Sequence, residues 1–186
     1  MAGDTDIPVS YLRECFELRE DGSLVWKTRP REHFANNQAW SAWNSRYAGQ
    51  PTGKALKGYL ATHIIWNGKK RSVLVHRIGF ALKNGRWPDE QIDHRNGRRN
   101  DNRPINLREA NRIEQGQNLK LYRNNTSGFP GVCWDKARGR WQVRLNLGGR
   151  GVFQTRCDSF DEACSAYLSA KQRFHSFQPE LRECLD

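Results

Sequence analysis

Asp93 and His94 are adjacent in this chain, and Asn106 follows twelve residues after His94. An imidazole can take a proton from water near neutral pH, because its reference pKa lies closest to neutrality. A carboxylate is a hard oxygen ligand that suits Mg²⁺. The side-chain carbonyl of Asn106 could hold the imidazole in one orientation. This set of side chains could therefore hydrolyse a phosphodiester bond with the help of a metal ion.

The segment between His94 and Asn106 is cationic and rich in turn-forming residues, which suits a site that receives a phosphate. We expect its arginines to contact a nucleic acid: Arg95, Arg98, Arg99 and Arg103. Structural alternatives stay open. Asp93 could form a salt bridge with one of the nearby arginines. Asn106 could be a helix N-cap, because Glu109 would then occupy the third helical position.

A second metal ligand is expected after Asn106, where residues 106–109 are predicted to open a helix that runs to about Leu119. Asn111, Gln115 and Asn118 lie four and three residues apart, so they share one face of such a helix. Any of them could present an oxygen to an ion held by Asp93, and spacing alone does not choose. The expected ion is Mg²⁺ or Mn²⁺. No structural zinc is expected, because the five cysteines form no C-x-x-C pair.

The charge of the chain points to a polyanionic partner. Lys and Arg number 31 against 20 acidic residues, a formal net charge of +11, which favours nucleic acid. An anionic membrane would instead favour a basic amphipathic helix, and none stands out. No run approaches the roughly 18 apolar residues of a membrane span. The scattered cysteines fit a reducing cytosol.

The chain is predicted to divide into segments 1–56, 57–118 and 119–177, followed by a tail at 178–186. The first segment opens with a helix whose apolar stripe includes Val9 and Leu12, and a short strand follows at 23–26. Residues 28–54 lack a clean period and are predicted to be irregular, with Trp40 and Trp43 as packing anchors.

The second segment is predicted to begin with a hairpin, strands 59–66 and 72–75, turning at Asn67-Gly68. This dipeptide favours a type I′ turn, which needs positive φ at both central positions. A helix is predicted from His76 to Lys83. His76 is interpreted as structural, with a phosphate contact as the alternative.

The third segment is predicted to form strands 131–134, 140–146 and 150–154, followed by a helix capped by Ser159. Along the middle strand, side chains alternate between a core face and an outer face. The outer face and its flanks carry good donors to phosphates and base edges: Arg138, Arg140, Gln142, Arg144, Asn146 and Arg150. An ordinary solvated polar face is the alternative.

Three stretches of the second segment, 75–77, 92–97 and 101–110, resemble the HNH endonucleases of phages, including homing enzymes. The resemblance implies a ββα-metal fold, with His94 as general base, Asp93 as metal ligand and Asn106 orienting the histidine. The family usually carries another metal-binding Asn or His on the helix. Gln115 stands at that position here, and Asn118 could substitute for it.

Residues 124–175 resemble the AP2 DNA-binding domain, although the usual Leu-Gly between the third strand and the helix is missing. The expected fold is therefore α+β, with a β-rich segment, a ββα-metal module and an AP2-like three-stranded antiparallel sheet packed on one helix. The expected function is metal-dependent nicking of double-stranded DNA by a monomer or dimer, in the cytoplasm of a bacterial host. The rival is a DNA-binding regulator without catalysis.

Overall fold

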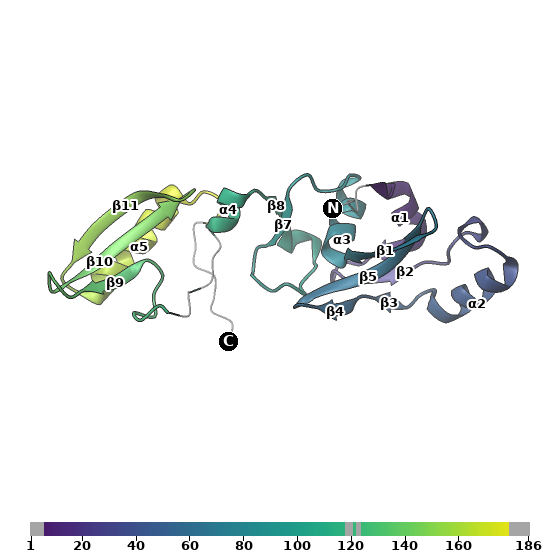
Figure 1. Cartoon of the computed structure of the whole chain (residues 1–186), viewed down its shortest axis with the longest axis horizontal. Coiled ribbons are helices and arrows are strands. Elements are labelled where there is room, and N and C mark those ends of the chain that lie inside the picture. The colour runs from purple at the N-terminus through teal and green to yellow at the C-terminus, as the bar shows by residue number, and fades with distance from the viewer. Residues whose placement is uncertain (1–5, 118–120, 122–123, 179–186) are drawn as a thin grey trace. The chain divides into compact units, whose positions relative to one another are not determined.

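The computed structural model describes residues 6–117, 121 and 124–178. The chain divides into two compact units, residues 1–109 and 110–186, and each is described by itself (Figure 1). The boundaries predicted from the sequence lie after residues 56 and 118 instead. Within the described segments, no helix is long and apolar enough to cross a membrane.

The first unit begins with the predicted helix α1 (Val9–Cys15), which leads into a three-stranded sheet of order β1-β2-β3. These strands are β1 (Phe16–Leu18), β2 (Leu24–Trp26) and β3 (Pro51–Thr52). Between β2 and β3, residues predicted to be irregular form a short 3₁₀ turn, η2 (Arg31–His33), and helix α2 (Asn37–Tyr47). Asn36 caps α2 by accepting from the Ala39 N–H. The sequence pattern missed this helix because none of its residues is buried.

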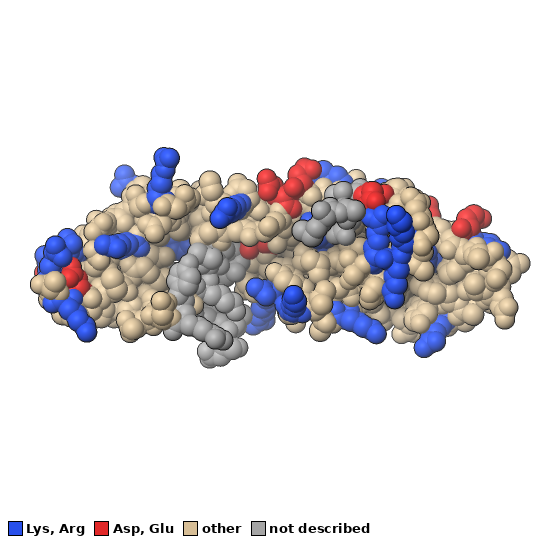
Figure 2. Space-filling model, viewed as in Figure 1, with Lys and Arg blue, Asp and Glu red and all other residues tan. Residues whose placement is uncertain are grey.

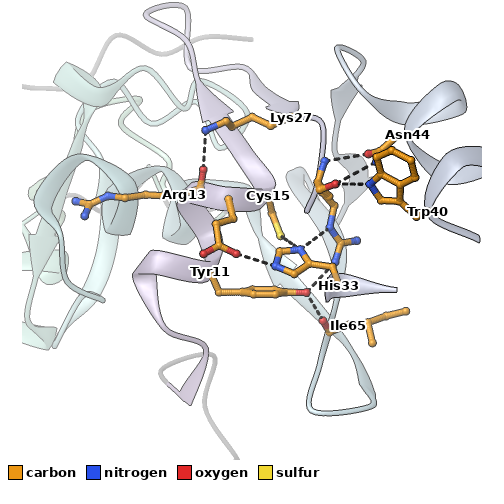
Figure 3. Close-up of polar contacts among 10 residues, drawn as sticks. Tyr11, Arg13, Cys15, Lys27, His33, Trp40, Asn44 and Ile65 are labelled. Carbon is orange, nitrogen blue, oxygen red and sulfur yellow. Dashed lines mark hydrogen bonds and ion pairs between the residues drawn. The ribbon is translucent and has the colours of Figure 1, made fainter. Parts of the chain in front are cut away.

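A buried arginine joins α2 to the rest of the first unit. The Arg29 guanidinium lies 4.9 Å from the ring centroids of both Phe34 and Trp43, and it donates to the Tyr11 hydroxyl at 2.8 Å. The Arg29 carbonyl accepts from Trp40 and Asn44 of α2. Figure 3 shows Tyr11, Cys15 and His33 converging at this point, while Trp40 and Asn44 approach from the other side. Stacking on aromatic faces compensates a guanidinium for lost hydration.

A second sheet of order β4-β5-β6 follows: β4 (Lys54–Leu56), β5 (Tyr59–Trp66) and β6 (Lys69–Leu74). The predicted turn is confirmed, with φ of +50° at Asn67 and +70° at Gly68. Helix α3 (Val75–Asn84) then ends at Gly85 in the left-handed conformation. Leu12 and Leu24 share one buried core with Ile64, Val73 and Ile78. This shared core unites residues from both sides of the predicted boundary after 56.

Strands β7 (Gln91–His94) and β8 (Leu107–Ala110) form a two-stranded sheet on either side of the cationic loop. The turn η3 (Pro104–Asn106) precedes β8. The prediction that residues 106–109 open a helix was wrong. Helix α4 (Arg112–Gly116) begins later, after Asn111, whose side chain accepts from the N–H groups of Ile113 and Glu114. An Asn followed three residues later by Glu occurs at both 106–109 and 111–114, and only the second makes a capping box.

The second unit has the predicted sheet and helix. Strands β9 (Val132–Asp135), β10 (Arg140–Leu147) and β11 (Arg150–Cys157) form an antiparallel sheet with β10 in the centre. Helix α5 (Phe160–Phe174) begins after Ser159, which accepts from the Glu162 N–H at 3.1 Å. Val143 and Leu145 of β10 are buried in one cluster with Ala163 and Tyr167 of α5. The helix therefore covers one face of the sheet.

Candidate active site

Asp93 and His94 lie at the end of β7. The carboxylate of Glu109 holds the segment that precedes this strand. Glu109 of β8 accepts from the Arg86 guanidinium at 2.5 and 3.1 Å and from the Asp89 N–H at 2.7 Å. The Arg86 hydrogen bond lowers the pKa of Glu109. These contacts of Glu109 join the segment before β7 to β8, and they thereby fix the position of Asp93 and His94.

Asp93 forms an ion pair with Arg108 of β8. Both the Nε and a terminal nitrogen of Arg108 lie 3.0 Å from the same oxygen, Oδ2. The two side chains are 14% and 10% exposed for Arg108 and Asp93. The alternative weighed from the sequence is thus realised with Arg108, which is not one of the loop arginines. A divalent ion at Asp93 would compete with this guanidinium for Oδ2.

His94 is 5% exposed and lies among two other rings and one amide. Its ring centroid is 5.1 Å from that of His76 and 5.9 Å from that of Tyr59. Its Nε2 lies 3.3 Å from Oδ1 of Asn102. Burial, followed by the positive charges that His94 and Arg77 can carry, lowers the pKa of His76 to about 3. His76 is therefore uncharged at neutral pH, where its ring packs beside that of His94.

Asn106, the residue expected to orient His94, fastens the loop instead. Its amide donates to Oδ1 of Asn96 at 3.0 Å and to the Asp101 carbonyl at 2.8 Å, and its Oδ1 accepts from the Asn96 N–H. The Asn106 carbonyl accepts from the Arg95 N–H at 2.9 Å. These contacts set the path of residues 95–101. The amide in contact with the imidazole belongs to Asn102, a residue for which the sequence predicted no role.

The turn between β1 and β2 braces the same loop. Gly22 has φ of +82°, and a Cβ built there would lie 2.3 Å from the Arg103 nitrogen and the Asn102 carbonyl carbon. Only glycine allows the two backbones to approach this closely. The turn between β1 and β2 therefore packs directly against the backbone of Asn102 and Arg103.

The four loop arginines differ in what holds them. Arg103 donates to both oxygens of Asp101, at 2.8 and 2.6 Å, and this pairing followed by the Asn96 amide lowers the pKa of Asp101 to about 2. Arg99 lies over the Tyr59 ring and reaches the Lys57 carbonyl at 3.4 Å. The side chains of Arg95 and Arg98 are exposed, and neither has an ion pair among residues 6–117.

The candidate amide ligands lie after β8. Asn111 uses its oxygen to cap α4, Gln115 lies on α4 and is partly exposed, and Asn118 falls outside the described residues. Within the part of the chain described, no three His, Cys, Asp or Glu side chains gather into a metal site. A ligand set with one carboxylate, amide oxygens and water fits the hard ion Mg²⁺, which keeps several waters in proteins.

The outer face of the second unit carries cations that differ in their pairing. Arg140 pairs with Asp158 at 2.7 Å, and Arg138 pairs with Asp135 at 3.2 Å. Arg144 and Arg150 are exposed and have no ion pair within residues 124–178. Asn146 is exposed as expected. On the face drawn in Figure 2, Lys and Arg side chains appear on both units and outnumber the acidic ones.

Gln142 departs from the alternation of buried and exposed side chains expected along β10. It is only 8% exposed, although its neighbours Arg140 and Arg144 are exposed. Its Oε1 accepts from the Cys133 thiol at 3.9 Å on the adjacent strand. Long side chains on flanking strands cover a central position of a sheet, which alternation along one strand does not reveal.

Residues 73–117 match the family model of HNH endonucleases. No curated protein and no solved structure matches the chain. The matched region begins in β6 and ends directly after α4, so it contains Asp93, His94, Asn102 and Asn106. The match supports a function of the nuclease type, for which the family implies DNA as the substrate and a divalent metal as the usual cofactor.

Proposed function

We propose that this protein is a metal-dependent endonuclease that nicks double-stranded DNA. The observation that carries the proposal is the placement of Asp93 and His94 at the end of β7, beside a cationic loop, inside the region that matches the HNH endonucleases. The proposal also accounts for the net charge of +11. The likeness of residues 75–110 to phage homing enzymes favours a bacterial cytoplasm as the place of action.

In this proposal His94 removes a proton from the attacking water, and Asp93 holds Mg²⁺ or Mn²⁺ with an amide from Gln115 or Asn118. A bound ion would neutralise phosphoryl oxygens and stabilise the leaving oxygen. Asn106 keeps the loop in the shape that presents Arg95 and Arg98 to the DNA backbone. One such site hydrolyses one strand, so a double-strand break needs two copies or two successive events.

The second unit is proposed to bind DNA through its sheet, as an AP2-like domain would. Support comes from the three strands covered on one face by α5, and from Arg144 and Arg150, whose guanidinium groups are exposed without ion pairs in the described unit. A guanidinium without an ion pair can bind a phosphate without first breaking a contact with a carboxylate. This unit would supply affinity and sequence preference, and the first unit would supply the chemistry.

Supercoiled plasmid tests the proposal. Incubation with protein and Mg²⁺ or Mn²⁺ should convert the plasmid to the open circle, and EDTA should prevent this. His94→Ala should lower the rate by at least about 100-fold, because general-base catalysis contributes about 10² to 10⁴. His63→Ala is the matched control, since His63 is an exposed histidine of the same unit. Nicking that survives in His94→Ala would exclude the assigned base.

A DNA-binding regulator is the second candidate, and the ion pair of Asp93 with Arg108 favours it. A guanidinium satisfies the carboxylate without a metal. Gln115, one methylene longer than the usual Asn, also departs from the family pattern. Tight DNA binding without nicking at any concentration of Mg²⁺ or Mn²⁺ would decide for the regulator.

A further inference from the structure

We propose that helix α2 is a recognition helix whose outer face enters the major groove of duplex DNA. The outer face of α2 consists of five exposed residues: Gln38, Ser41, Ala42, Ser45 and Arg46. The helix precedes residues 73–117, which match the HNH endonucleases, and it belongs to the first unit. It therefore lies outside both the candidate active site and the sheet proposed to bind DNA. The inference rests on the proposed function only for the identity of the partner, duplex DNA.

The rotation of α2 about its axis is fixed by contacts on its inner side. The Trp40 indole and the Asn44 amide both donate to the Arg29 carbonyl, at 2.9 and 3.1 Å, and Oδ1 of Asn44 accepts from the Arg29 N–H at 2.9 Å. Figure 3 shows Trp40 and Asn44 directed to the same point. The Trp43 ring centroid lies 4.9 Å from that of Trp26. Since successive helical residues are about 100° apart, these contacts turn the outer face away from the rest of the unit.

Helix α2 lacks the features that usually stabilise a surface helix. Such a helix normally buries an apolar face or carries ion pairs along its length. None of the residues of α2 is buried, and Arg46 is its single charged residue. The chain instead holds this helix through Arg29, which is only 6% exposed. A helix held in this way, with its polar face left open, is expected where that face has a binding role.

The outer face carries side chains that read base edges. Gln38, Ser41, Ala42 and Ser45 follow the spacing i, i+3, i+4, i+7, so they form one stripe along two turns. Gln pairs with adenine, Ser pairs with several base edges, and the methyl group of Ala contacts that of thymine. The stripe is about 10 Å long at a rise of about 1.5 Å per residue. The major groove, about 12 Å wide, admits an α-helix, and the small side chains let the helix backbone approach the bases.

The charge around α2 is complementary to a polyanion. Residues 33–88 contain no aspartate or glutamate, and they contain nine lysines and arginines. Arg46, at the end of the outer face, forms no ion pair with the other residues described in the first unit, and its guanidinium lies 5.3 Å from the Tyr47 ring centroid. A duplex bound at this face would meet no carboxylate from the stretch that contains the helix.

The same face fits a protein partner poorly. Protein interfaces have an apolar core that is enriched in aromatic residues, whereas Ala42 is the only apolar residue of the outer face. A second copy, docked face to face, would place like charges opposite one another. Duplex DNA is thus the partner whose chemistry the face matches.

The first test places a negative charge on the outer face. Ser41→Glu should weaken binding of the full-length protein to a fluorescent duplex pool of random sequence by at least about 10-fold, because like charges at an interface are unfavourable. Ser10→Glu, the matched control, changes an exposed serine on α1 of the same unit and should have a much smaller effect. Fluorescence anisotropy in EDTA measures both affinities while no strand is cut. Equal affinities for the two variants would overturn the inference.

The second test measures base preference. Duplexes selected from the random pool by the wild type should prefer adenine at one position by about 5- to 150-fold, as one bidentate pair provides. Gln38→Ala should lose the preference at that position alone. Gln50→Ala changes an exposed glutamine of the same unit and should keep every preference. Identical selected sequences for the wild type and Gln38→Ala would exclude readout by α2.

Both tests are independent of catalysis. A protein that passes them and never nicks DNA would keep the recognition helix and refute the nuclease. A protein that nicks DNA while Ser41→Glu binds as tightly as the wild type would keep the nuclease and refute the recognition helix. If Ser41→Glu dissociated an oligomer, measured by light scattering, with unchanged affinity for DNA, the face would belong to a second copy and the inference would be overturned.

Discussion

In the proposed function the Asp93 carboxylate exchanges a guanidinium partner for a metal ion, and the balance between the two determines whether the metal binds. Arg108 contacts Oδ2 with two nitrogens in a largely buried pair. Removing one partner of a buried pair is costly because the other charge stays uncompensated. A divalent ion can compensate the same carboxylate, so metal and Arg108 should substitute for one another.

Arg108→Met tests this exchange. In EDTA the variant should lose about 3 kcal/mol of unfolding free energy, at the low end for broken buried pairs, and Mn²⁺ should restore part of the loss. Thermal unfolding with and without Mn²⁺ measures both. Arg103→Met is the control, because it breaks the pair with Asp101, which is no predicted ligand. An equal effect of Mn²⁺ on wild type and both variants would contradict metal binding at Asp93.

His76 should make stability depend on pH. Its pKa is about 3 in the folded protein and near 6.5 when exposed, because burial disfavours its charged form. The unfolded chain therefore binds more protons between these values, and the stability present above pH 6.5 is lost as pH falls, by at most about 1.4 kcal/mol per unit. Urea denaturation of wild type and His76→Phe should diverge as pH rises from 4.5 to 7. Parallel curves would contradict a neutral His76.

Among the elements, the turn between β1 and β2 acts on the site without belonging to it. Gly22→Ala should displace the backbone at Asn102 and reduce nicking, because the added Cβ would meet backbone atoms at 2.3 Å. Gly49→Ala is the matched control, since Gly49 also has positive φ, +77°, and nothing within 4 Å of a Cβ. Both variants share the backbone strain of a left-handed alanine, so the difference in plasmid nicking isolates the contact. Equal activities would show that the turn does not support the loop.

The elements also show where local sequence patterns are ambiguous. Residues 106–109 and 111–114 both read as helix starts, but Glu109 is used by Arg86 and the Asp89 N–H. Residues 107–110 consequently pair with β7 as a strand. Helix α2 was not predicted because its contacts are made by single anchors such as Trp43 and not by a periodic stripe. Tertiary contacts override local propensity in both cases.

For the whole molecule, the division of labour between the two units predicts separable defects. Arg144→Ala should weaken DNA binding and lower the salt slope of log K by about 1, because one phosphate contact is lost. Slow nicking should remain. Arg173→Ala removes the same charge from α5, on the covered side of the sheet, and should leave binding unchanged. Fluorescence anisotropy between 50 and 200 mM salt measures the slope, and a complete loss of nicking in Arg144→Ala would contradict the division.

The sequence by itself determined the residues that could do chemistry, the hairpin at Asn67-Gly68 and the sheet and helix of the second unit. Each of these follows from short-range rules of residue type, period and turn geometry. Only the tertiary structure decided which partner each polar group receives. Asp93 pairs with Arg108, the Asn106 amide donates to the Asp101 carbonyl within the loop, and Asn102 contacts His94. Several amides and arginines of one short loop could make equivalent hydrogen bonds, and packing against distant segments such as Gly22 selects among them.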